Sequence, residues 1–315
     1  MDIYEQMIRY FSDAPDLTTW EEVQALFQDV GTSKPHHWRL PILACQAVGG
    51  SLDQVLPAAV AMACGYISII LVDDMLDADP RGEYHRLGMP AVANMACAFQ
   101  AAALAVLDHC ELADMSKKMA MDDMNQMILT TSLGQYWDTL CLPDEAAYWR
   151  VVHTKSSPFF GSALYIGTLA GGGNVGVARR LKELGLLYGE MVQILDDLDD
   201  AMDVPASPDW TSGRSTLPIL FARLVEHPDQ QRFIELCREP LDETGLAEAQ
   251  TILIHCGAIS YGIDQLIHRY KKSRSILETL SLCAPQSLLE MIEETIYPVD
   301  KLFEALGIPQ FSSPV

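Results

Sequence analysis

The chain has 315 residues, 49% of them hydrophobic, and a formal net charge of −22 at pH 7. This composition provides ample apolar material for a large core beneath an acidic surface. The negative charge argues against nucleic acid and anionic membranes as partners, because phosphate-rich surfaces attract basic proteins.

Helix-forming residues dominate most of the chain. Ala, Leu, Met, Gln and Glu are abundant in long segments, and no alternating β-branched run stands out. The Gly-, Pro- and Ser-rich breaks are too short to be clear domain linkers. The sequence therefore predicts an all-α fold and a single domain over residues 1–315. The predicted helices cover residues 2–12, 18–30, 39–48, 52–77, 89–109, 114–139, 144–170, 175–202, 215–225, 228–237, 244–256, 258–280 and 285–306.

The N-terminus and the cysteines indicate a cytoplasmic protein. The first residues, MDIYEQMIRYF, are amphipathic and carry acids, so no secretory signal is visible. The eight cysteines show no C-x-x-C spacing, and several lie in apolar runs, as small core residues of a reducing compartment do. They are Cys45, Cys64, Cys97, Cys110, Cys141, Cys237, Cys256 and Cys283.

Two apolar runs, Val55–Val72 and Met89–Leu107, approach the length of a membrane span. Polar residues dilute both runs, and neither has a clear basic flank. A helix surrounded by other helices is also apolar on most sides. We therefore expect two core helices and no membrane span.

The first apolar run ends in an acidic cluster, DDMLD. Asp73 and Asp77 are four residues apart, so a helix places their carboxylates one turn apart on one face, with Asp74 about 100° around the axis. Close carboxylates beside apolar surface repel one another. Magnesium relieves such a cluster, because it takes one or two carboxylates and fills its other positions with water and phosphate oxygens. The cluster predicts a site for a metal ion and a phosphate group.

A second acidic cluster repeats this spacing much later in the chain. Asp196, Asp197 and Asp200 follow another apolar helical run, in LLYGEMVQILDDLDD. An acidic helix end would explain one such triplet on its own. Two copies of D-D-x-x-D, each interrupting an apolar run, favour a shared function instead.

The clusters and the motifs between them resemble the trans-polyprenyl diphosphate synthases of the class I isoprenoid synthase fold. DDMLD and DDLDD resemble the two aspartate-rich motifs of that family, and Gln193 occupies the place of the glutamine before the second. GQYWD, residues 134–138, resembles the family's G-Q-x-x-D, and Lys155-Ser156 resembles its Lys-Thr pair. The resemblance extends over roughly residues 46–209, with weaker agreement to residues 217–218.

This resemblance implies a helical bundle with a central apolar cavity, three magnesium ions and a homodimer. The substrates would be an allylic prenyl diphosphate and, for elongation, isopentenyl diphosphate. Metal ions and fixed cations neutralise the departing pyrophosphate, while an apolar cavity keeps water from the carbocation. The implied metal ligands are Asp73, Asp77, Asp138, Asp196 and Asp200, and the implied catalytic set comprises Asp73, Asp74, Asp77, Asp196, Asp197, Asp200 and Lys155.

Cationic and polar residues complete the implied diphosphate site. HRLGMP, which contains Arg86, resembles the family's Arg-Arg-Gly-x-Pro, and Arg214 follows Gly213 where the family usually carries Gly-Lys. Arginine offers phosphate a rigid fork and lysine a point charge. A solvated surface position is the alternative interpretation of Arg86 and Lys155. The expected diphosphate-binding set is Arg39, Arg86, Lys155, Gln193 and Arg214.

Several departures from the family pattern concern the second substrate. Leu87 stands where the family has a second arginine. In SKPHHWRLPI, His36 or His37 falls near the position of a family lysine, and Arg39 is offset by one residue from an arginine. The missing cations are those that the family uses for isopentenyl diphosphate.

Three classes of function are therefore open. Elongation with isopentenyl diphosphate at a rebuilt acceptor site is our first expectation, because the resemblance covers most of the chain. A terpene cyclase, which closes the allylic cation on itself without a second diphosphate, is the alternative. A catalytically silent partner subunit is disfavoured because both aspartate motifs are intact.

The loop Val204–Gly213, VPASPDWTSG, follows the second cluster directly. In that place it can act as a lid that excludes water from the carbocation. An ordinary surface connection is an equally good interpretation.

The residues before Asp73 bear on the length of the prenyl chain. In the family, the residues four and five before the first aspartate help set the pocket floor, and here they are Ile69 and Ser68. Gly65 continues this wall without an aromatic ring, whereas Tyr66 blocks it if its ring turns inward; the alternative is a core tyrosine. We expect a pocket for a chain of twenty carbons or more.

Overall fold

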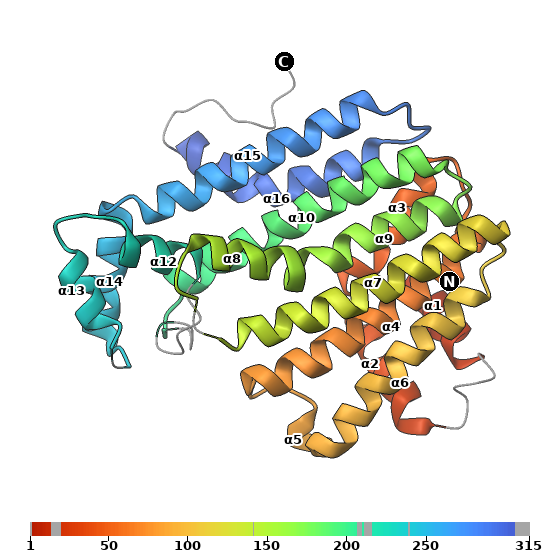
Figure 1. The fold of residues 1–315 in the computed structure, drawn as a ribbon, viewed down its shortest axis with the longest axis horizontal. Helices are drawn as coiled ribbons and strands as arrows, with labels where there is room; N and C mark the ends of the chain where they lie inside the picture. Colours follow the sequence, from red (N-terminus) through yellow and green to blue (C-terminus); the bar gives the residue numbers. More distant parts are fainter. Residues whose placement is uncertain are drawn as a thin grey trace. The chain divides into compact units, whose positions relative to one another are not determined.

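The computed structural model describes residues 2–13, 20–140, 142–206, 210, 216–238 and 240–305. Over these residues its regular elements are helices, without a strand, which confirms the predicted all-α class (Figure 1). The elements are α1 (Ile3–Ser12), α2 (Glu21–Thr32), η1 (His36–Arg39), α3 (Leu40–Ala47), α4 (Leu52–Asp77), α5 (Tyr84–Leu87), α6 (Met89–Asp108), α7 (Asp114–Asp138), α8 (Glu145–Val151), η2 (Val152–Ser156), α9 (Ser157–Ala170), α10 (Val175–Met202), α12 (Leu217–Leu224), α13 (Gln230–Leu236), α14 (Glu243–His255), α15 (Ala258–Thr279) and α16 (Gln286–Ala305).

The predicted helices agree with these bounds to within a few residues, with three exceptions. The short elements η1 and α5 lie in segments that were expected to be largely irregular. The helix expected over 144–170 is interrupted by a π-helical turn, η2. Of the loop Val204–Gly213, residues 207–209 and 211–213 lie outside the described residues, so the proposed lid stays a prediction.

The helices belong to two compact units. The first unit comprises residues 1–132, 158–186 and 276–288, and the second comprises residues 133–157, 187–275 and 289–315. Helices α7, α10, α15 and α16 each supply residues to both units. The single domain expected from the sequence stays a prediction.

Aromatic side chains hold the N-terminal helices of the first unit together. The rings of Phe11 on α1 and Phe27 on α2 stack with centroids 4.0 Å apart. Trp38 of η1 packs 4.9 Å from Phe27, and Phe99 of α6 packs 6.1 Å from Phe11. All four residues are fully buried, so each contributes a large apolar area to the core.

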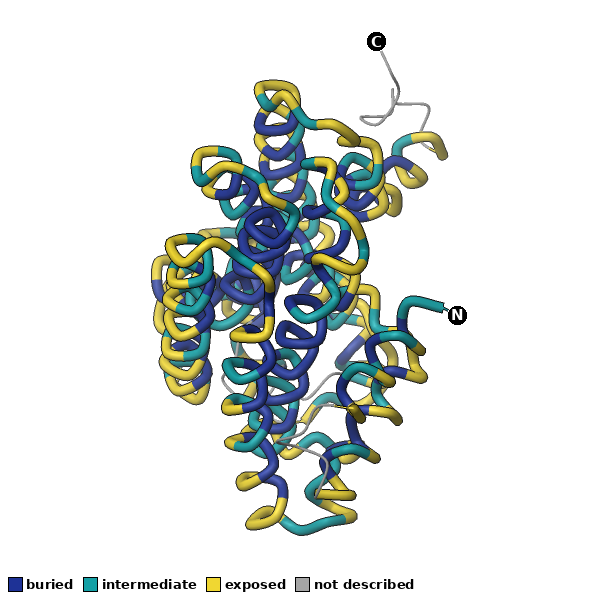
Figure 2. The backbone as a smooth tube through the Cα atoms, turned by 90° about the vertical axis from the view of Figure 1, so that its right-hand side faces the viewer, coloured by how far each residue is buried: buried dark blue, intermediate teal, exposed yellow. Residues whose placement is uncertain are grey.

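Helix α4 is the long central helix of the first unit and packs along α6 and α3. It begins with a capping box in which Ser51 and Gln54 exchange hydrogen bonds with each other's backbone. Both α4 and α6 are long and apolar enough to cross a membrane, with mean hydropathies of 2.3 and 1.6. The apolar window of α4 is 67% buried. Figure 2 shows buried turns of the backbone in dark blue and exposed turns in yellow. Burial in a core accounts for much of the apolarity of α4, whereas the corresponding window of α6 is 44% buried. The absence of a membrane span stays a prediction.

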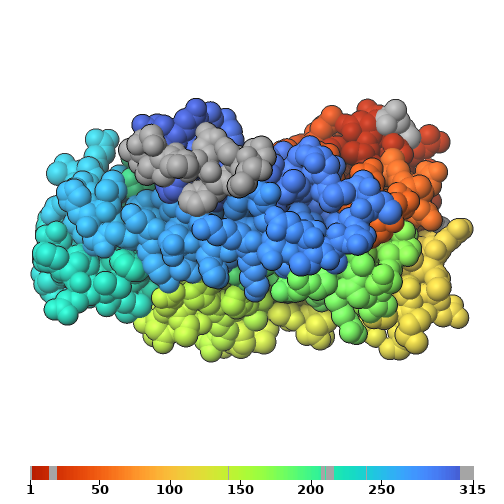
Figure 3. Space-filling model, turned by 90° about the horizontal axis from the view of Figure 1, so that it is seen from above, coloured from red at the N-terminus to blue at the C-terminus, as the bar shows by residue number. Residues whose placement is uncertain are grey.

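The second unit has its own apolar core around α12, α13 and α14. Trp210 packs 6.0 Å from Phe233, and Ile219, Leu246 and Leu253 join the same buried cluster. Residues of α13 and α14 lie together on the surface in Figure 3, coloured in the cyan range of the bar. Helix α8 and the part of α10 from residue 187 onward also belong to this unit, and they carry most of the polar network described next.

Candidate active site

The first acidic cluster lies in the last turns of α4. Asp73 and Asp74 are half-buried, and Asp77 is exposed. The helix ends at Asp77, and the next residue, Ala78, is left-handed with a φ of 54°. The backbone N–H of Asp79 donates to the carbonyl of Asp74. Burial, reinforced by the charges of Asp79 and Asp73, raises the pKa of Asp74 to about 6. The cluster is therefore a crowded set of carboxylates with access to solvent.

The second acidic cluster lies near the end of α10. Partial burial, together with the charges of Asp200 and Asp199, raises the pKa of Asp196 to about 6, although this side chain still reaches solvent. Burial also raises the pKa of Asp200, and the charges of Asp203 and Asp199 act in the same direction. Both clusters thus hold carboxylates that ionise less readily than free aspartate.

Asp197 differs from its neighbours because the fold uses its carboxylate internally. The residue is 3% exposed. Its Oδ2 accepts hydrogen bonds from the Tyr148 hydroxyl at 2.6 Å and the Leu217 N–H at 2.7 Å, and its Oδ1 accepts from Gln193 Nε2 at 2.9 Å. The sequence placed Asp197 in the catalytic set, and the structure places it at the centre of a hydrogen-bond network that joins α8, α10 and the start of α12.

The donors of both clusters fit magnesium. Among the described residues, no three His, Cys, Asp or Glu side chains are already arranged around a metal position. Magnesium needs no such cage, because it binds through one or two carboxylates and keeps water and phosphate oxygens as its other ligands. Burial, and after it the charge of neighbouring carboxylates, raises the pKa of Asp74 and Asp196, and a divalent cation would offset the repulsion between these carboxylates.

Lys155 lies in the π turn between α8 and α9 and forms an ion pair with Asp138 at the end of α7. The Lys155 Nζ to Asp138 Oδ2 distance is 2.5 Å, and both side chains are less than one-fifth exposed. A Cβ atom on Gly134 would lie 2.3 Å from the Lys155 backbone nitrogen, so only glycine permits α7 to pack this closely on the turn. The G-Q-x-x-D spacing thus combines a close backbone contact with a carboxylate one turn later.

Ser156 and Gln193 connect the π turn to the second acidic cluster. Ser156 Oγ donates to Gln193 Oε1 at 2.6 Å, and Gln193 in turn donates to Asp197. The motif residues that lie far apart in the sequence are therefore one network in the second unit. The sequence pattern does not mark Tyr148, which completes this network from α8.

The other expected cations have different surroundings. Arg86 of α5 is exposed and pairs with Glu83, with Nη2 and Oε2 2.7 Å apart. Arg39 is exposed in η1. Arg214 lies outside the described residues. The role of each in binding diphosphate stays a prediction.

His37 is not suited to replace a missing cation. Its ring packs edge-on against Phe160 with centroids 4.9 Å apart, and it also lies near Tyr66. Burial, with a smaller effect of His36, lowers the pKa of His37 to about 4. The imidazole is therefore neutral at neutral pH, which leaves His36 as the more exposed of the two histidines.

The expected chain-length residues lie in the interior of the first unit. Ser68 is 2% exposed, and Ile69 is half-buried. A Cβ on Gly65 would lie 3.4 Å from the Met127 Cε, so a methionine of α7 covers α4 at this point. The Tyr66 ring packs on Phe159, with centroids 5.5 Å apart, and on His37. The sequence alone did not indicate Met127, because its contact with α4 joins distant segments.

A family model for polyprenyl synthetases matches residues 32–253. The chain belongs to the polyprenyl synthetase family. It is 28% identical over 272 residues to the geranylgeranyl diphosphate synthase of Methanosarcina mazei, covering 80% of this chain and 82% of the relative.

Solved structures of similar proteins share the fold. The geranylgeranyl pyrophosphate synthetase of Pyrococcus horikoshii superposes with a TM-score of 0.81 at 18% identity, over 95% of this chain and 94% of that one. The geranylgeranyl pyrophosphate synthase of Corynebacterium glutamicum, solved with calcium and isoprenyl diphosphate, superposes with a TM-score of 0.78 at 18% identity over 94% of each chain.

These comparisons confirm the isoprenoid synthase fold and the first expected function, a prenyltransferase that elongates prenyl chains. They give no support to the cyclase alternative, since the relatives named above are diphosphate synthases. The family uses a divalent metal, in agreement with the metal expected at the aspartate clusters.

Proposed function

We propose that this chain extends an all-trans allylic prenyl diphosphate with isopentenyl diphosphate, in a reaction that requires Mg²⁺. The observation that carries this proposal is the network of Lys155, Asp138, Ser156, Gln193 and Asp197. It connects a fixed ammonium group with the helix that bears the second acidic cluster. Such preorganised charge is what ionisation of an allylic diphosphate requires.

The aspartate clusters would hold the metal, with Asp73 and Asp77 at the first, Asp196 and Asp200 at the second, and three ions in all by family resemblance. Bound magnesium supplies charge neutralisation of the departing pyrophosphate. Asp138 differs from these ligands because its carboxylate accepts a hydrogen bond from the Lys155 ammonium group, and we assign it to orienting that group.

The chain's own cations would bind the diphosphates. Lys155 is held by Asp138 and contacts the allylic diphosphate, while Arg86 exchanges Glu83 for a phosphate group when substrate binds. Arg39 and His36 would serve isopentenyl diphosphate, and Arg214 would close on the allylic diphosphate. Arg39→Ala should therefore raise the KM for isopentenyl diphosphate more than that for the allylic substrate.

The pocket would accept chains of twenty carbons or more. The wall of α4 presents Ser68 and Gly65 rather than large rings, and the methionine that covers Gly65 is a flexible side chain. The relative from Methanosarcina mazei is named for a twenty-carbon product, geranylgeranyl diphosphate. Apolar walls of this kind also keep water from the carbocation.

The protein would act in the cytoplasm as a homodimer without a membrane span. Helix α7 presents an apolar stripe to solvent at Leu129, Leu133 and Tyr136, which are 67%, 45% and 60% exposed. Their spacing of four and three residues places them on one face of the helix. A second copy that packs on this stripe would remove it from water.

One incubation tests the proposal. Labelled geranyl, farnesyl or geranylgeranyl diphosphate is supplied with Mg²⁺, with and without isopentenyl diphosphate, and the products are separated by chromatography. We expect longer prenyl diphosphates only when isopentenyl diphosphate is present. Cyclic hydrocarbons or alcohols formed without it would overturn the proposal in favour of a cyclase.

A further inference from the structure

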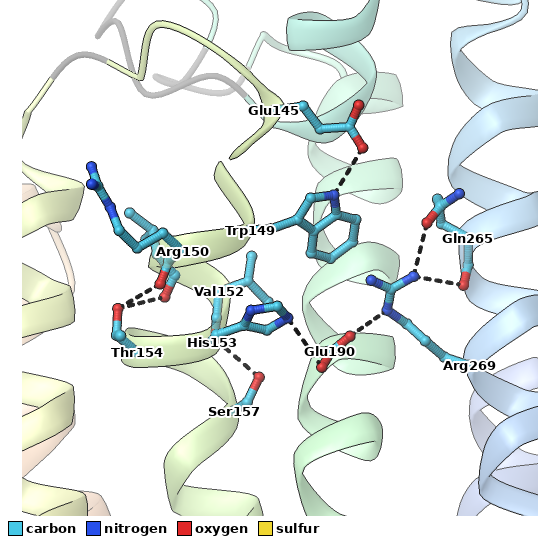
Figure 4. Close-up of polar contacts among 11 residues, drawn as sticks. Glu145, Trp149, Arg150, Val152, His153, Thr154, Ser157, Glu190, Gln265 and Arg269 are labelled. Carbon is cyan, nitrogen blue, oxygen red and sulfur yellow. Dashed lines mark hydrogen bonds and ion pairs between the residues drawn. The ribbon is translucent and has the colours of Figure 1, made fainter. Parts of the chain in front are cut away.

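Side chains in and beside the π turn, Val152–Ser156, form hydrogen bonds with its backbone and with the end of α8. A π turn departs from the regular helical hydrogen-bond pattern and recurs at functional sites. Thr154 Oγ1 donates to the Arg150 carbonyl at 2.7 Å, and Ser157 Oγ donates to the Val152 carbonyl at 3.0 Å (Figure 4). The Val152 carbonyl also accepts a hydrogen bond from the backbone N–H of Ser157, so this residue bonds to the turn through both its backbone and its side chain.

Glu190 of α10 contacts the same turn through the side chain of His153. Its Oε1 lies 3.3 Å from His153 Nε2, and its Oε2 accepts a hydrogen bond from Arg269 Nε at 2.5 Å (Figure 4). The side chains of Glu190 and Arg269 are only 12% and 10% exposed, whereas that of His153 is 52% exposed. One carboxylate thus joins the π turn on one side to α15 on the other.

Arg269 is itself fixed in place. Its Nη1 donates to the carbonyl and to the Oε1 of Gln265, at 3.1 and 2.9 Å. Its guanidinium group lies 4.0 Å from the centre of the Trp149 ring, and the Trp149 Nε1 donates to Glu145 at 2.8 Å. These contacts with Gln265 and Trp149 restrict the Arg269 side chain, so its Nε points to Glu190.

The charge of Glu190 is maintained in spite of burial. Burial by itself would raise the pKa of this carboxyl, but the hydrogen bond from His153 and the charge of Arg269 bring it below its usual value. A buried ion pair contributes little net stability compared with apolar side chains of similar size. Apolar side chains would therefore hold α10 and α15 together equally well. Stability alone does not explain why His153, Glu190 and Arg269 form a charged cluster here.

The place of this charged cluster beside Lys155 indicates its function. His153 and Lys155 are two residues apart, so they point to roughly opposite sides of the turn. Fixing His153 on one side fixes the direction of the lysine on the other. We propose that Glu190 is a positioning residue, which holds the π turn through His153 and Arg269 so that Lys155 meets the diphosphate. This role rests on the proposed function of Lys155.

A double-mutant cycle tests whether Glu190 acts through Lys155. The probe is inorganic pyrophosphate with Mg²⁺, and its dissociation constant is measured by calorimetry for the wild type, Glu190→Ala, Lys155→Ala and the double variant. We expect Glu190→Ala to weaken binding by about tenfold, the loss of one charge-assisted hydrogen bond. In the Lys155→Ala background the same change should have an effect of less than about twofold. Equal effects in both backgrounds would overturn the proposal.

A matched control separates positioning from stability. Asp123→Asn removes the charge from a second, mostly buried ion pair, that of Asp123 with Lys182 in the first unit. We expect it to lower the unfolding temperature while changing the pyrophosphate dissociation constant by less than about twofold. If Glu190→Ala does not fold, His153→Ala replaces it, because this side chain is half exposed, and about threefold weaker binding is expected. Unchanged binding in the folded variant would refute the role of Glu190.

The binding experiment also separates this inference from the proposed function. Pyrophosphate binding does not depend on which prenyl product is formed. A wild type that binds pyrophosphate with Mg²⁺ but makes no longer chains would overturn the proposed elongation, and the cycle would still decide the role of Glu190.

Discussion

Asp74 and Asp197 hold the same place in the two copies of D-D-x-x-D, yet the fold uses them differently. Asp197 is buried, and its two oxygens accept hydrogen bonds from Tyr148, Leu217 and Gln193. No described side chain donates a hydrogen bond to the Asp74 carboxylate, whose pKa is raised to about 6 by burial and by its acidic neighbours. A shared spacing therefore does not imply a shared role.

The difference has a physical origin in what surrounds each helix end. In the second unit, α8 and the start of α12 bring donors to the carboxylate of α10. In the first unit, α4 ends in a left-handed turn, followed by the exposed ion pair of Asp79 and Arg81. Asp197 is thus part of the hydrogen-bond network of the second unit, whereas the carboxylate of Asp74 lies among acidic neighbours that repel it.

The largest expected effect distinguishes the two residues directly. Asp197→Ala leaves three donors without their acceptor, at a cost of about 3 kcal/mol or more, because each unsatisfied buried donor costs about 1–3 kcal/mol. We expect the unfolding temperature to fall by about 4–6 °C and turnover to fall by about a hundredfold. Differential scanning calorimetry and initial rates measure the two effects.

Asp74→Ala is the matched control for that change. It removes a carboxylate that is repelled by its neighbours, so the unfolding temperature without Mg²⁺ should hold or rise. If Asp74→Ala proved as destabilising as Asp197→Ala, the two positions would not differ as the contacts indicate.

The stability of the metal-free protein should depend on pH through the crowded aspartates. The pKa values of Asp74 and Asp196 are about 6 in the folded chain and near the reference value of 3.8 when unfolded. The folded state therefore binds protons more readily, and these two groups destabilise it above pH 6 and cease to do so as the pH falls toward 4. The unfolding temperature should rise by about 2–4 °C between pH 7 and pH 5, relative to Asp74→Asn/Asp196→Asn.

Magnesium should reduce this dependence. Because metal and protons compete for the same carboxylates, the stabilisation by Mg²⁺ should be larger at pH 7 than at pH 5. A wild type and a double variant with the same pH slope would show that these aspartates do not carry the effect.

A smaller effect concerns the product rather than the rate. Ser68 is buried on α4, and Ser68→Phe would fill space along this helix without touching either acidic cluster. We expect the longest product to shorten by about one isoprene unit, since one helical turn of wall corresponds to roughly one unit. Chromatography of the products measures their chain length. Ser68→Ala is the control, because it replaces the serine without adding volume. An unchanged length distribution would place the pocket along another face.

The fold was predictable from the sequence because its signals are local and repeated. Long apolar helices, a capping residue such as Ser51 and short polar breaks mark the helix bounds to within a few residues. The π turn at Val152–Ser156 was not predictable, because its sequence continues the helical pattern on both sides. The close contact of Gly134 with the backbone of Lys155 lies at this turn, and it joins segments that are about twenty residues apart in the sequence.

The candidate site was predictable in its motifs but not in its network. Spacing alone identified Asp73 and Asp196 as candidates. The roles of Tyr148 and Glu190 depend on contacts between segments far apart in the chain, which no local pattern encodes. The same is true of His37, which the sequence offered as a cation and which burial keeps neutral.

The most direct test of the proposed function is the incorporation of radiolabelled isopentenyl diphosphate into farnesyl diphosphate by the wild type, Asp73→Ala and Asp196→Ala, with and without Mg²⁺. We predict that the wild type incorporates label only with Mg²⁺. Each variant should lose at least about a hundredfold in rate while its unfolding temperature without Mg²⁺ holds or rises. Incorporation without a divalent metal, or full rates in both folded variants, would contradict the assignment of the two clusters to magnesium-dependent chain elongation.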